Sequence, residues 1–230
     1  MRILLKCTIV IVLWMVGITV NAKLTNNMFD IRHIGYSEGL SSLRVFSTVE
    51  DKYGVMWIAS KVGIDRYNGH TVKNYTLPGN FHYGDMAGRR LRLLYDEQYG
   101  VWAYDNTGKI YHYSIQNDAF EQYLSLNEFI SGEIILNKIC LDNKGILWLG
   151  LSNGLYRKEV DGRITPVVQE HYVNDIVSTA ELLFVGTSRG VFQLPHNQLN
   201  KIHWLVNGKD VQTLFCDVTK KELWIGTFNN

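Results

Sequence analysis

The sequence predicts an all-β fold, a β-propeller of four-stranded blades, and three observations lead to it. A short aromatic-centred pattern recurs, an apolar or thiol residue precedes each aromatic by eight positions, and a glycine follows most of them by six. The aromatic residues of the five copies are Trp57, Trp102, Trp148, Phe184 and Trp224. Their separations of 45, 46, 36 and 40 residues are typical of propeller blades, which stack on their neighbours around an axis.

The residues before each aromatic predict the first hairpin of a blade. The positions eight residues upstream are Val49, Leu94, Cys140, Ile176 and Cys216. In three copies, a polar stretch that opens with Asp and closes with Gly separates the two apolar runs, at 51–54, 96–100 and 142–145. Such a stretch is typical of a β-hairpin connection.

The glycine after each aromatic predicts the second hairpin. The residues at this position are Gly63, Gly108, Gly154 and Gly190, and we expect a positive φ there. Runs that suit third strands follow at 64–67, 110–113 and 154–156, and residues 71–75 suit a fourth strand. Each unit is therefore expected to contain four antiparallel strands.

The N-terminal segment predicts export. Arg2 and Lys6 precede an apolar run over residues 7–20, and Ala22 stands at a small-residue cleavage position. Residues 1–22 are therefore predicted to be a secretory signal peptide. The alternative is an uncleaved membrane anchor, although the run is short for a spanning helix.

Residues 23–230 are predicted to form the N-terminal part of the propeller. The last copy reaches Asn230 before its third and fourth strands, so about four and a half blades are expected. Because an unclosed propeller leaves edge strands open, we interpret the sequence as a piece of a longer protein.

The charge balance excludes one class of partner. The chain has 23 basic and 22 acidic residues, and loss of Arg2 and Lys6 with the signal peptide would leave 21 against 22. The sequence has no basic stripe of the kind that nucleic-acid binding requires, so we expect no direct nucleic-acid contact by this region.

Two cysteines fall at a predicted buried position. Cys140 and Cys216 stand where the other copies have Val, Leu or Ile, so both are expected to be buried like small hydrophobic residues. A disulfide needs Cα atoms within about 7 Å, and a whole blade would separate these two. We therefore predict no disulfide between them.

The sequence lacks motifs for catalysis, cofactors and metals. The seven histidines show neither zinc-ligand spacing nor a His-x-Glu motif, and no Gly-x-Ser-x-Gly elbow or phosphate-binding glycine loop occurs. Each Asp-to-Gly turn supplies one or two acids, whereas calcium takes about six or more oxygen ligands. We therefore predict no catalytic residue, no cofactor and no metal site in this chain.

One long connection is the candidate ligand-binding segment. Residues 77–90 exceed a minimal link between blades, and loops on rigid scaffolds commonly carry recognition residues. The side chains in it that could bind a sugar or an anion are Phe81, His82, Tyr83, Arg89 and Arg90. The alternative is that the aromatic rings cap the blade edge and the arginines are solvated.

Tyrosines recur in the expected third and fourth strands. They are Tyr67, Tyr75, Tyr111, Tyr113, Tyr123 and Tyr156. Because alternating aromatics suit outer blade strands, we expect these rings to pack between adjacent sheets rather than to form a carbohydrate platform.

Beyond its periodicity, the sequence resembles the two-component regulator propeller family. The stretch Gly39-Leu-Ser-Ser42 leads into Val45, then Asp51-x-x-Gly54-x-x-Trp57-Ile, and then Gly63-Ile-Asp-Arg-Tyr67-Asn-Gly69. The resemblance spans nearly all of residues 29–230 and is strongest in the first and third copies. The second copy has Ala103-Tyr104 in place of an Ile-Gly pair. The fourth has Phe184 in place of Trp and lacks the Asp-x-x-Gly turn.

This resemblance implies a function that composition alone does not. Members are mostly periplasmic sensor regions of Bacteroides-like hybrid two-component system histidine kinases, in which two propellers and a β-sandwich precede a membrane helix and the kinase. By resemblance, this chain is a ligand-sensing propeller in the periplasm, and the full-length protein is an inner-membrane homodimer. The expected partners are an oligosaccharide and the remaining blades and second propeller of the same protein. The kinase would lie outside this chain, which is not itself expected to be an enzyme.

Two alternatives belong to other functional classes. The first is a periplasmic propeller enzyme that acts on polysaccharide, such as a lyase or a glycosidase, since the scaffold hosts those activities too. It would require clustered acids or a Tyr, His and Arg constellation on one funnel face. The second is a propeller that binds another protein and does not signal.

Overall fold

The computed structural model describes residues 31–79 and 88–228. Residues 34–230 form one compact unit. Its described part contains eighteen strands and two short 3-10 helices, η1 (Tyr36–Glu38) and η2 (Leu126–Glu128). Within these ranges no helix is both long enough and apolar enough to cross a membrane. The predicted signal peptide, residues 1–22, lies outside the described residues.

Four antiparallel sheets of four strands follow one another along the chain, each in sequence order. Blade one consists of β1 (Val45–Glu50), β2 (Met56–Ser60), β3 (Ile64–Tyr67) and β4 (Val72–Tyr75). Blade two consists of β5 (Leu91–Asp96), β6 (Gly100–Asp105), β7 (Lys109–Ser114) and β8 (Ala119–Ser125). Blade three consists of β9 (Leu136–Leu141), β10 (Leu147–Leu151), β11 (Gly154–Lys158) and β12 (Ile164–Gln169). Blade four consists of β13 (Val173–Ser178), β14 (Leu182–Thr187), β15 (Gly190–Pro195) and β16 (His203–Asn207).

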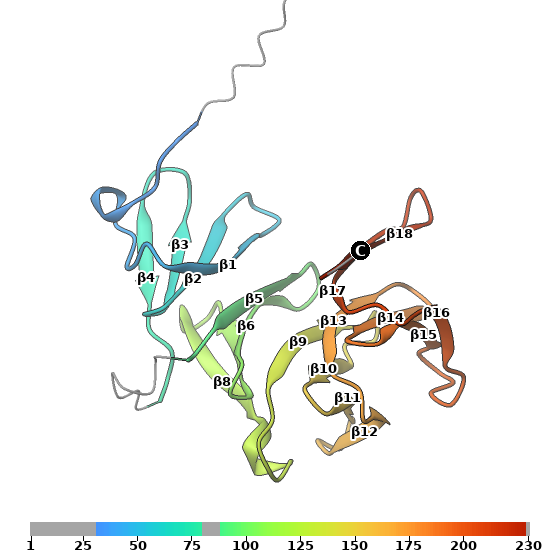
Figure 1. The fold of residues 1–230 in the computed structure, drawn as a ribbon. Coiled ribbons are helices and arrows are strands. Elements are labelled where there is room, and N and C mark those ends of the chain that lie inside the picture. The colour runs from blue at the N-terminus through green and yellow to red at the C-terminus, as the bar shows by residue number, and fades with distance from the viewer. Residues whose placement is uncertain (1–30, 80–87, 229–230) are drawn as a thin grey trace, which may run out of the picture. The chain divides into compact units, whose positions relative to one another are not determined.

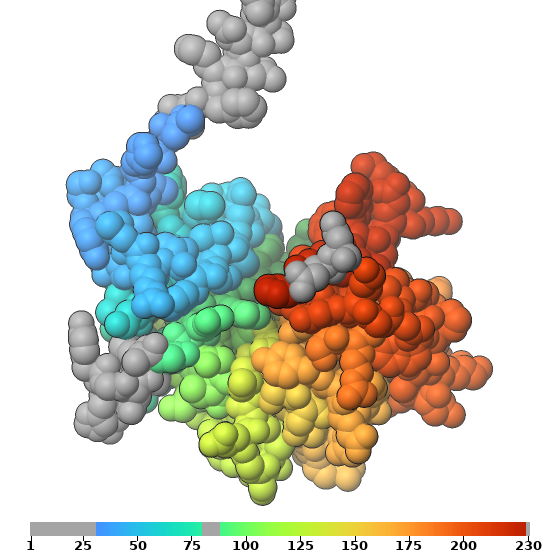
Figure 2. Space-filling model, viewed as in Figure 1, coloured from blue at the N-terminus to red at the C-terminus, as the bar shows by residue number. Residues whose placement is uncertain are grey.

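Blade five is a two-stranded sheet of β17 (Val211–Asp217) and β18 (Glu222–Thr227). The strands β1, β5, β9, β13 and β17 contact one another in chain order, which makes them the inner strands around a common axis. Figure 1 shows them meeting at the centre of the unit, with the last strand of each full blade further out. The blades follow one another in chain order, as the colours of Figure 2 show. The predicted β-propeller of four-stranded blades is confirmed.

The core lies between successive blades. Trp57 is 2% exposed and packs against Tyr113 and Phe120 of blade two, with ring centroids 4.7 and 5.8 Å apart. Trp148 is fully buried at the corresponding place between blades three and four. Trp224 is 61% exposed, because no described blade packs against it. The aromatic residue of the repeat therefore fills the interface with the next blade.

The Asp-to-Gly turns hold this aromatic in place. One carboxylate oxygen of Asp142 accepts hydrogen bonds from the backbone N–H groups of Lys144 and Ile146. Its other oxygen accepts the indole N–H of Trp148 at 3.1 Å. Asp51 makes the same three bonds, to Tyr53 N, Val55 N and Trp57 Nε1. A single side chain thus shapes the hairpin and orients the interface tryptophan.

The glycine of the second hairpin has a broader role than predicted. Gly108, Gly154 and Gly190 have positive φ angles of 91°, 154° and 142°, whereas Gly63 does not, so the prediction is wrong there. A Cβ at Gly63 would overlap the carbonyl oxygen of Tyr75 in the fourth strand. Close approach of two strands is the reason for this glycine.

The two cysteines differ. Cys140 is buried as predicted, and burial raises the pKa of its thiol to about 12. Cys216 is only half-buried, contrary to the prediction, because no described sheet covers blade five on its far side. Both are free thiols.

The tyrosines of the outer strands also divide. Tyr75, Tyr111 and Tyr156 are buried, as the packing interpretation predicts. Tyr123 is 45% exposed, although its ring lies 4.9 Å from that of Trp102. The buried rings serve the interfaces between the sheets.

Candidate functional site

The connection between blades one and two separates the predicted ligand-binding residues. Phe81, His82 and Tyr83 lie outside the described residues. Arg89 is engaged within the protein: its Nε lies 2.6 Å from Asp105 Oδ2, and its Nη2 donates to the Tyr111 hydroxyl at 3.2 Å. Arg90 has an exposed side chain, and its backbone N–H donates to Asn106 at 2.7 Å.

The Arg89 ion pair is a structural feature. The side chain of Arg89 is 9% exposed and that of Asp105 is fully buried. Burial also raises the pKa of the neighbouring Tyr111 to about 12, so its hydroxyl stays protonated. Arg89 also borders a cavity of about 340 Å³ beside the β2–β3 turn. The arrangement anchors the entry to β5 and does not gather polar groups from several blades.

A second cavity lies at the axis, and it does gather polar groups from every described blade. Its volume is about 230 Å³. Its polar lining side chains are Ser47, Arg92, Tyr104, Lys138, Asn174, Asp175, Gln212 and Thr213. Most of them stand within the first three residues of an inner strand, so they share one end of the axis.

Polar groups near the axis tie consecutive inner strands together. The Ser47 hydroxyl accepts the backbone N–H of Leu93 at 3.2 Å. The Asn137 side-chain amide donates to the Val173 carbonyl at 2.8 Å, and that of Asn174 donates to the Val211 carbonyl at 2.7 Å. Polar residues at the axis are therefore partly structural.

A β-bulge places these amides. The registers of β1, β9, β13 and β17 against their second strands shift by one residue near the start of each inner strand. Asn137 and Asn174 are the extra residues in β9 and β13. Since a bulge re-aims a side chain, it turns each amide toward the neighbouring inner strand.

Blade two breaks this pattern. The pairing of β5 with β6 is regular, without a bulge, and Arg92 pairs with Tyr104 as Lys138 pairs with Gly150. The Arg92 guanidinium donates to the Asn137 carbonyl, whereas blades three and four tie consecutive inner strands through an Asn amide. Tyr104 stands where blades three and four have Gly150 and Gly186. At Gly150 a Cβ would lie only 2.7 Å from Val173 of the next inner strand.

The Tyr104 side chain occupies this interface and reaches the cavity. It is 3% exposed and packs in one cluster with Leu136 and Ile139 of blade three. Its side chain and that of Arg92 line the same cavity. Burial raises the pKa of Tyr104, so the group is a neutral hydrogen-bond donor at physiological pH.

The charges at the axis do not balance. Lys138 Nζ lies 2.8 Å from Asp175 Oδ1, and although burial opposes the charge, Asp175 raises the pKa of Lys138 above its usual value. The other Asp175 oxygen accepts Leu214 N at 2.8 Å and the Thr213 hydroxyl at 3.1 Å. Arg92 has no carboxylate partner in the described part of the chain. The cavity lining thus carries two cations and one anion.

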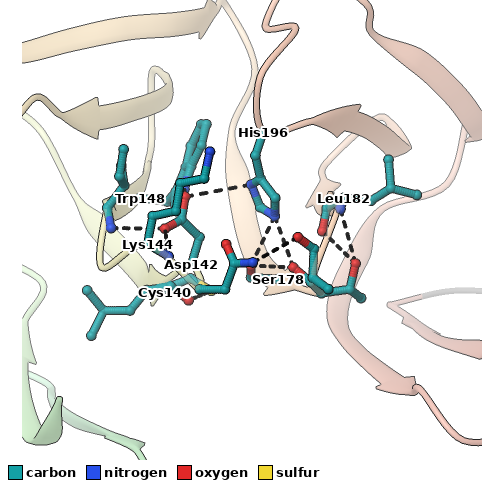
Figure 3. A network of polar contacts seen from close by, with 12 residues as sticks. Cys140, Asp142, Lys144, Trp148, Ser178, Leu182 and His196 are labelled. Atoms are coloured by element: carbon teal, nitrogen blue, oxygen red, sulfur yellow. Dashed lines mark hydrogen bonds and ion pairs between the residues drawn. The ribbon is translucent and has the colours of Figure 1, made fainter. Parts of the chain in front are cut away.

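A buried polar network joins blades three and four (Figure 3). The Ser178 hydroxyl lies 3.4 Å from His196 Nε2, and His196 Nδ1 lies 3.8 Å from Asp142 Oδ2. These are the residue types of a nucleophile, a base and an acid. No sequence motif points to His196, which directly follows β15 and whose backbone N–H donates to the Glu181 carbonyl in the β13–β14 turn.

The contacts of this network are structural. His196 Nε2 faces the Thr179 carbonyl at 3.0 Å, so it carries the proton and cannot accept one from Ser178. Asp142 is committed to the turn and to Trp148. His196 and Asp142 are almost fully buried, so the network tethers two blades and presents no reactive group.

Candidate metal ligands are scattered in the part of the chain that the structure describes. In residues 31–79 and 88–228, no three His, Cys, Asp or Glu side chains come close enough together to hold an ion. The polar axial cavity is therefore the leading candidate site, and its chemistry is that of hydrogen bonding and charge.

Comparisons with known proteins agree with the fold. Residues 39–61 match the family model described as two component regulator propeller. The extracellular domain of the putative hybrid two component system BT3049 from B. thetaiotaomicron is similar, with a TM-score of 0.64 and 20% identity over 85% of this chain. That of BT4673 gives a TM-score of 0.51 and 16% identity over 87% of this chain. No curated protein gives a significant match.

The likeness extends to propellers of other kinds. Virginiamycin B lyase from Staphylococcus aureus has a TM-score of 0.63 and 16% identity over 79% of this chain. The chain spans 29% of the BT3049 domain, 32% of the BT4673 domain and 62% of the lyase. At such identities these structures show the shared fold alone. With the match at residues 39–61, they confirm the resemblance of this chain to the two-component regulator propeller family.

Proposed function

We propose that this chain is part of the extracytoplasmic sensing region of a hybrid two-component sensor. The observation that carries the proposal is the match of residues 39–61 to the regulator propeller model. The fold shared with the extracellular domains of two putative hybrid systems supports it. In this proposal residues 1–22 direct export, residues 23–230 belong to the first propeller in the periplasm, and a membrane-linked histidine kinase lies elsewhere in the full-length homodimer.

The proposed ligand is an oligosaccharide, and the proposed binding region is the axial cavity. Its lining combines amide, hydroxyl and charged groups that can hydrogen-bond sugar hydroxyls. The cavity is formed by inner strands, which are tied together by Asn137 and Asn174. A rigid lining of this kind favours binding because few groups need to be ordered.

The proposed mechanism treats the propeller as a rigid body. Full blades are packed through buried aromatic residues such as Trp57 and Trp148, so ligand binding would not rearrange them internally. The ligand would instead favour one orientation of the propeller within the dimer, and that orientation would bias the packing of the kinase across the membrane.

The proposal is tested with the full-length protein in its own cells. Growth on single purified oligosaccharides identifies the one that activates the regulated genes, measured as transcript levels. Removal of residues 31–228 should then abolish the response to that oligosaccharide while the protein remains in the membrane. A response that survives this deletion would show that sensing resides elsewhere.

A further inference from the structure

Blade two departs from its neighbours where its side chains meet the axial cavity. There are three departures. The bulge of β5 is missing, so blade two has no counterpart of the extra residues Asn137 and Asn174. Arg92 makes the contact with the next inner strand, and Tyr104 stands at the position of a glycine. Blades three and four make the equivalent tethers with neutral Asn137 and Asn174. A tether between consecutive inner strands therefore requires neither a cation nor a phenol.

The charge of Arg92 is unmatched. This half-buried residue has no carboxylate partner in the described ranges, and its one hydrogen bond to the backbone goes to the Asn137 carbonyl. Asp175 cannot serve it, because that carboxylate is already occupied by Lys138, Thr213 and backbone N–H groups. Since a charge removed from water is costly when unpaired, an anion at this position would be stabilising.

The side chains that line the cavity with Arg92 include hydrogen-bond donors of the kind that a carboxylate needs. A guanidinium is a planar fork that binds a carboxylate through two parallel hydrogen bonds. The Tyr104 and Lys138 side chains line the same cavity as Arg92. The volume of about 230 Å³ lies below the roughly 300–1,000 Å³ of pockets for drug-sized molecules. One sugar-sized group fits this space, and a longer chain would extend out of it.

We propose that the blade-two side of the axial cavity is an anion subsite, in which Arg92, Tyr104 and Lys138 bind the carboxylate of a small acidic ligand. The carboxylate would belong to the terminal acidic sugar of an oligosaccharide. In this respect the inference rests on the proposed function, which is the sensing of an oligosaccharide. Arg92 supplies the paired hydrogen bonds, Tyr104 adds a neutral donor, and Lys138 adds charge while it stays paired with Asp175.

Calorimetric titration of the protein with glucuronate and with glucose tests the proposal. Glucose has the same ring without the carboxylate, so glucuronate should bind and glucose should bind at least about tenfold more weakly. Arg92→Gln should weaken glucuronate binding by about tenfold or more, the scale of a charge-assisted hydrogen bond. Arg163→Gln is the matched control, since it removes the same charge from a side chain that is 74% exposed on the β11–β12 turn. It should bind like the wild type.

Two further variants protect the test against a folding defect. Arg92→Lys keeps the charge without the planar fork, and Tyr104→Phe keeps the ring without the hydroxyl. Both should fold, as judged by circular dichroism, and both should bind glucuronate more weakly than the wild type. Equal affinity of the wild type for glucuronate and glucose would overturn the anion subsite. So would an affinity for glucuronate that is the same in the Arg92→Gln, Arg92→Lys and Arg163→Gln proteins.

The outcomes separate this inference from the proposed function. If glucuronate binds through Arg92 while no oligosaccharide activates the kinase, the subsite stands and the sensing function fails. If a neutral oligosaccharide activates the wild type and the Arg92→Gln protein equally, sensing stands and the subsite fails.

Discussion

Blades two and three share one repeat but use it differently. In blade three, Asp142 accepts backbone N–H groups of the turn and the indole N–H of Trp148. In blade two, Asp96 accepts only the backbone N–H groups of Gln98 and Tyr99, and no described residue accepts a hydrogen bond from the buried Trp102 indole.

The two blades differ at the axis as well. Blade three has Gly150 and a bulge, whereas blade two has Tyr104 and a regular strand that presents Arg92. In a repeat protein, the copies that agree show what the fold requires. The copy that departs shows which positions the fold leaves available for another function, such as binding. Here the departure coincides with the unmatched charge of the axial cavity.

The largest effect is expected at the turn aspartates. Asp142→Ala removes the acceptor of two backbone N–H groups and of a buried indole, so it should lower the free energy of unfolding by about 3 kcal/mol or more. Asp96→Ala removes only turn bonds at a half-buried site and should cost about 1 kcal/mol. Urea denaturation measures both. Equal losses would contradict the difference between the blades.

A second pair of variants isolates the indole hydrogen bond. Trp148→Phe and Trp102→Phe both shrink a buried ring, at 0% and 6% exposure, so their packing losses should be similar. Only Trp148 also loses a hydrogen bond to a carboxylate, which should make its variant less stable by roughly 2 kcal/mol. The difference between the two urea midpoints, multiplied by the m-value, gives this free energy. A larger loss of unfolding free energy in Trp102→Phe than in Trp148→Phe would mean that the Trp102 indole N–H has a hydrogen-bond acceptor.

The Tyr104 hydroxyl should matter little to the fold. Its ring packs against blade three, but the hydroxyl lies at the axial cavity, so Tyr104→Phe should change the unfolding free energy by less than about 1 kcal/mol. Thermal unfolding measures the change, with Tyr111→Phe as a control whose buried hydroxyl accepts a hydrogen bond from Arg89. A larger loss at Tyr104 than at Tyr111 would assign the hydroxyl a structural role.

The smallest effect concerns the outer edge of blades one and two. The Asp118 carboxylate is bound there by Lys73, Tyr113 and Tyr75, which hold its pKa well below the usual value. Because the pKa of Asp118 is lower in the folded state than in the unfolded state, the ionised carboxylate stabilises the fold at pH values above the unfolded pKa of about 3.9. This contribution is lost as the pH falls below that value. Asp118→Asn should therefore be slightly less stable than the wild type at pH 7. The gap should narrow below pH 4, as thermal melts would show. A gap independent of pH would exclude the carboxylate as its source.

Much of the fold could be predicted from the sequence. The period, the aromatic positions and the Asp-to-Gly turns lead to the blades because each reflects a local requirement repeated in every copy. The sequence predicts the position of the second-hairpin glycine correctly. At Gly63, however, a glycine is needed because a Cβ would overlap the carbonyl oxygen of Tyr75. Tyr75 belongs to the fourth strand, so this contact forms only when the whole blade folds.

The candidate site was less predictable. Arg89 is typical of a recognition residue in the sequence but is buried against Asp105, a partner that only the folded hairpin brings near. Arg92 and Tyr104 meet at the axis because inner strands converge there, which no local pattern reveals. The available signal was the departure of blade two from the Ile-Gly pair, because Tyr104 replaces a residue that must be small in the other full blades.

The most direct test of the central claim is a crystal structure of the protein with glucuronate. The glucuronate carboxylate should lie within hydrogen-bonding distance of the Arg92 guanidinium and the Tyr104 hydroxyl, with the sugar ring in the axial cavity. Glucuronate bound elsewhere, or an axial cavity without it at a saturating concentration, would contradict the claim that blade two departs from the repeat in order to bind an acidic ligand.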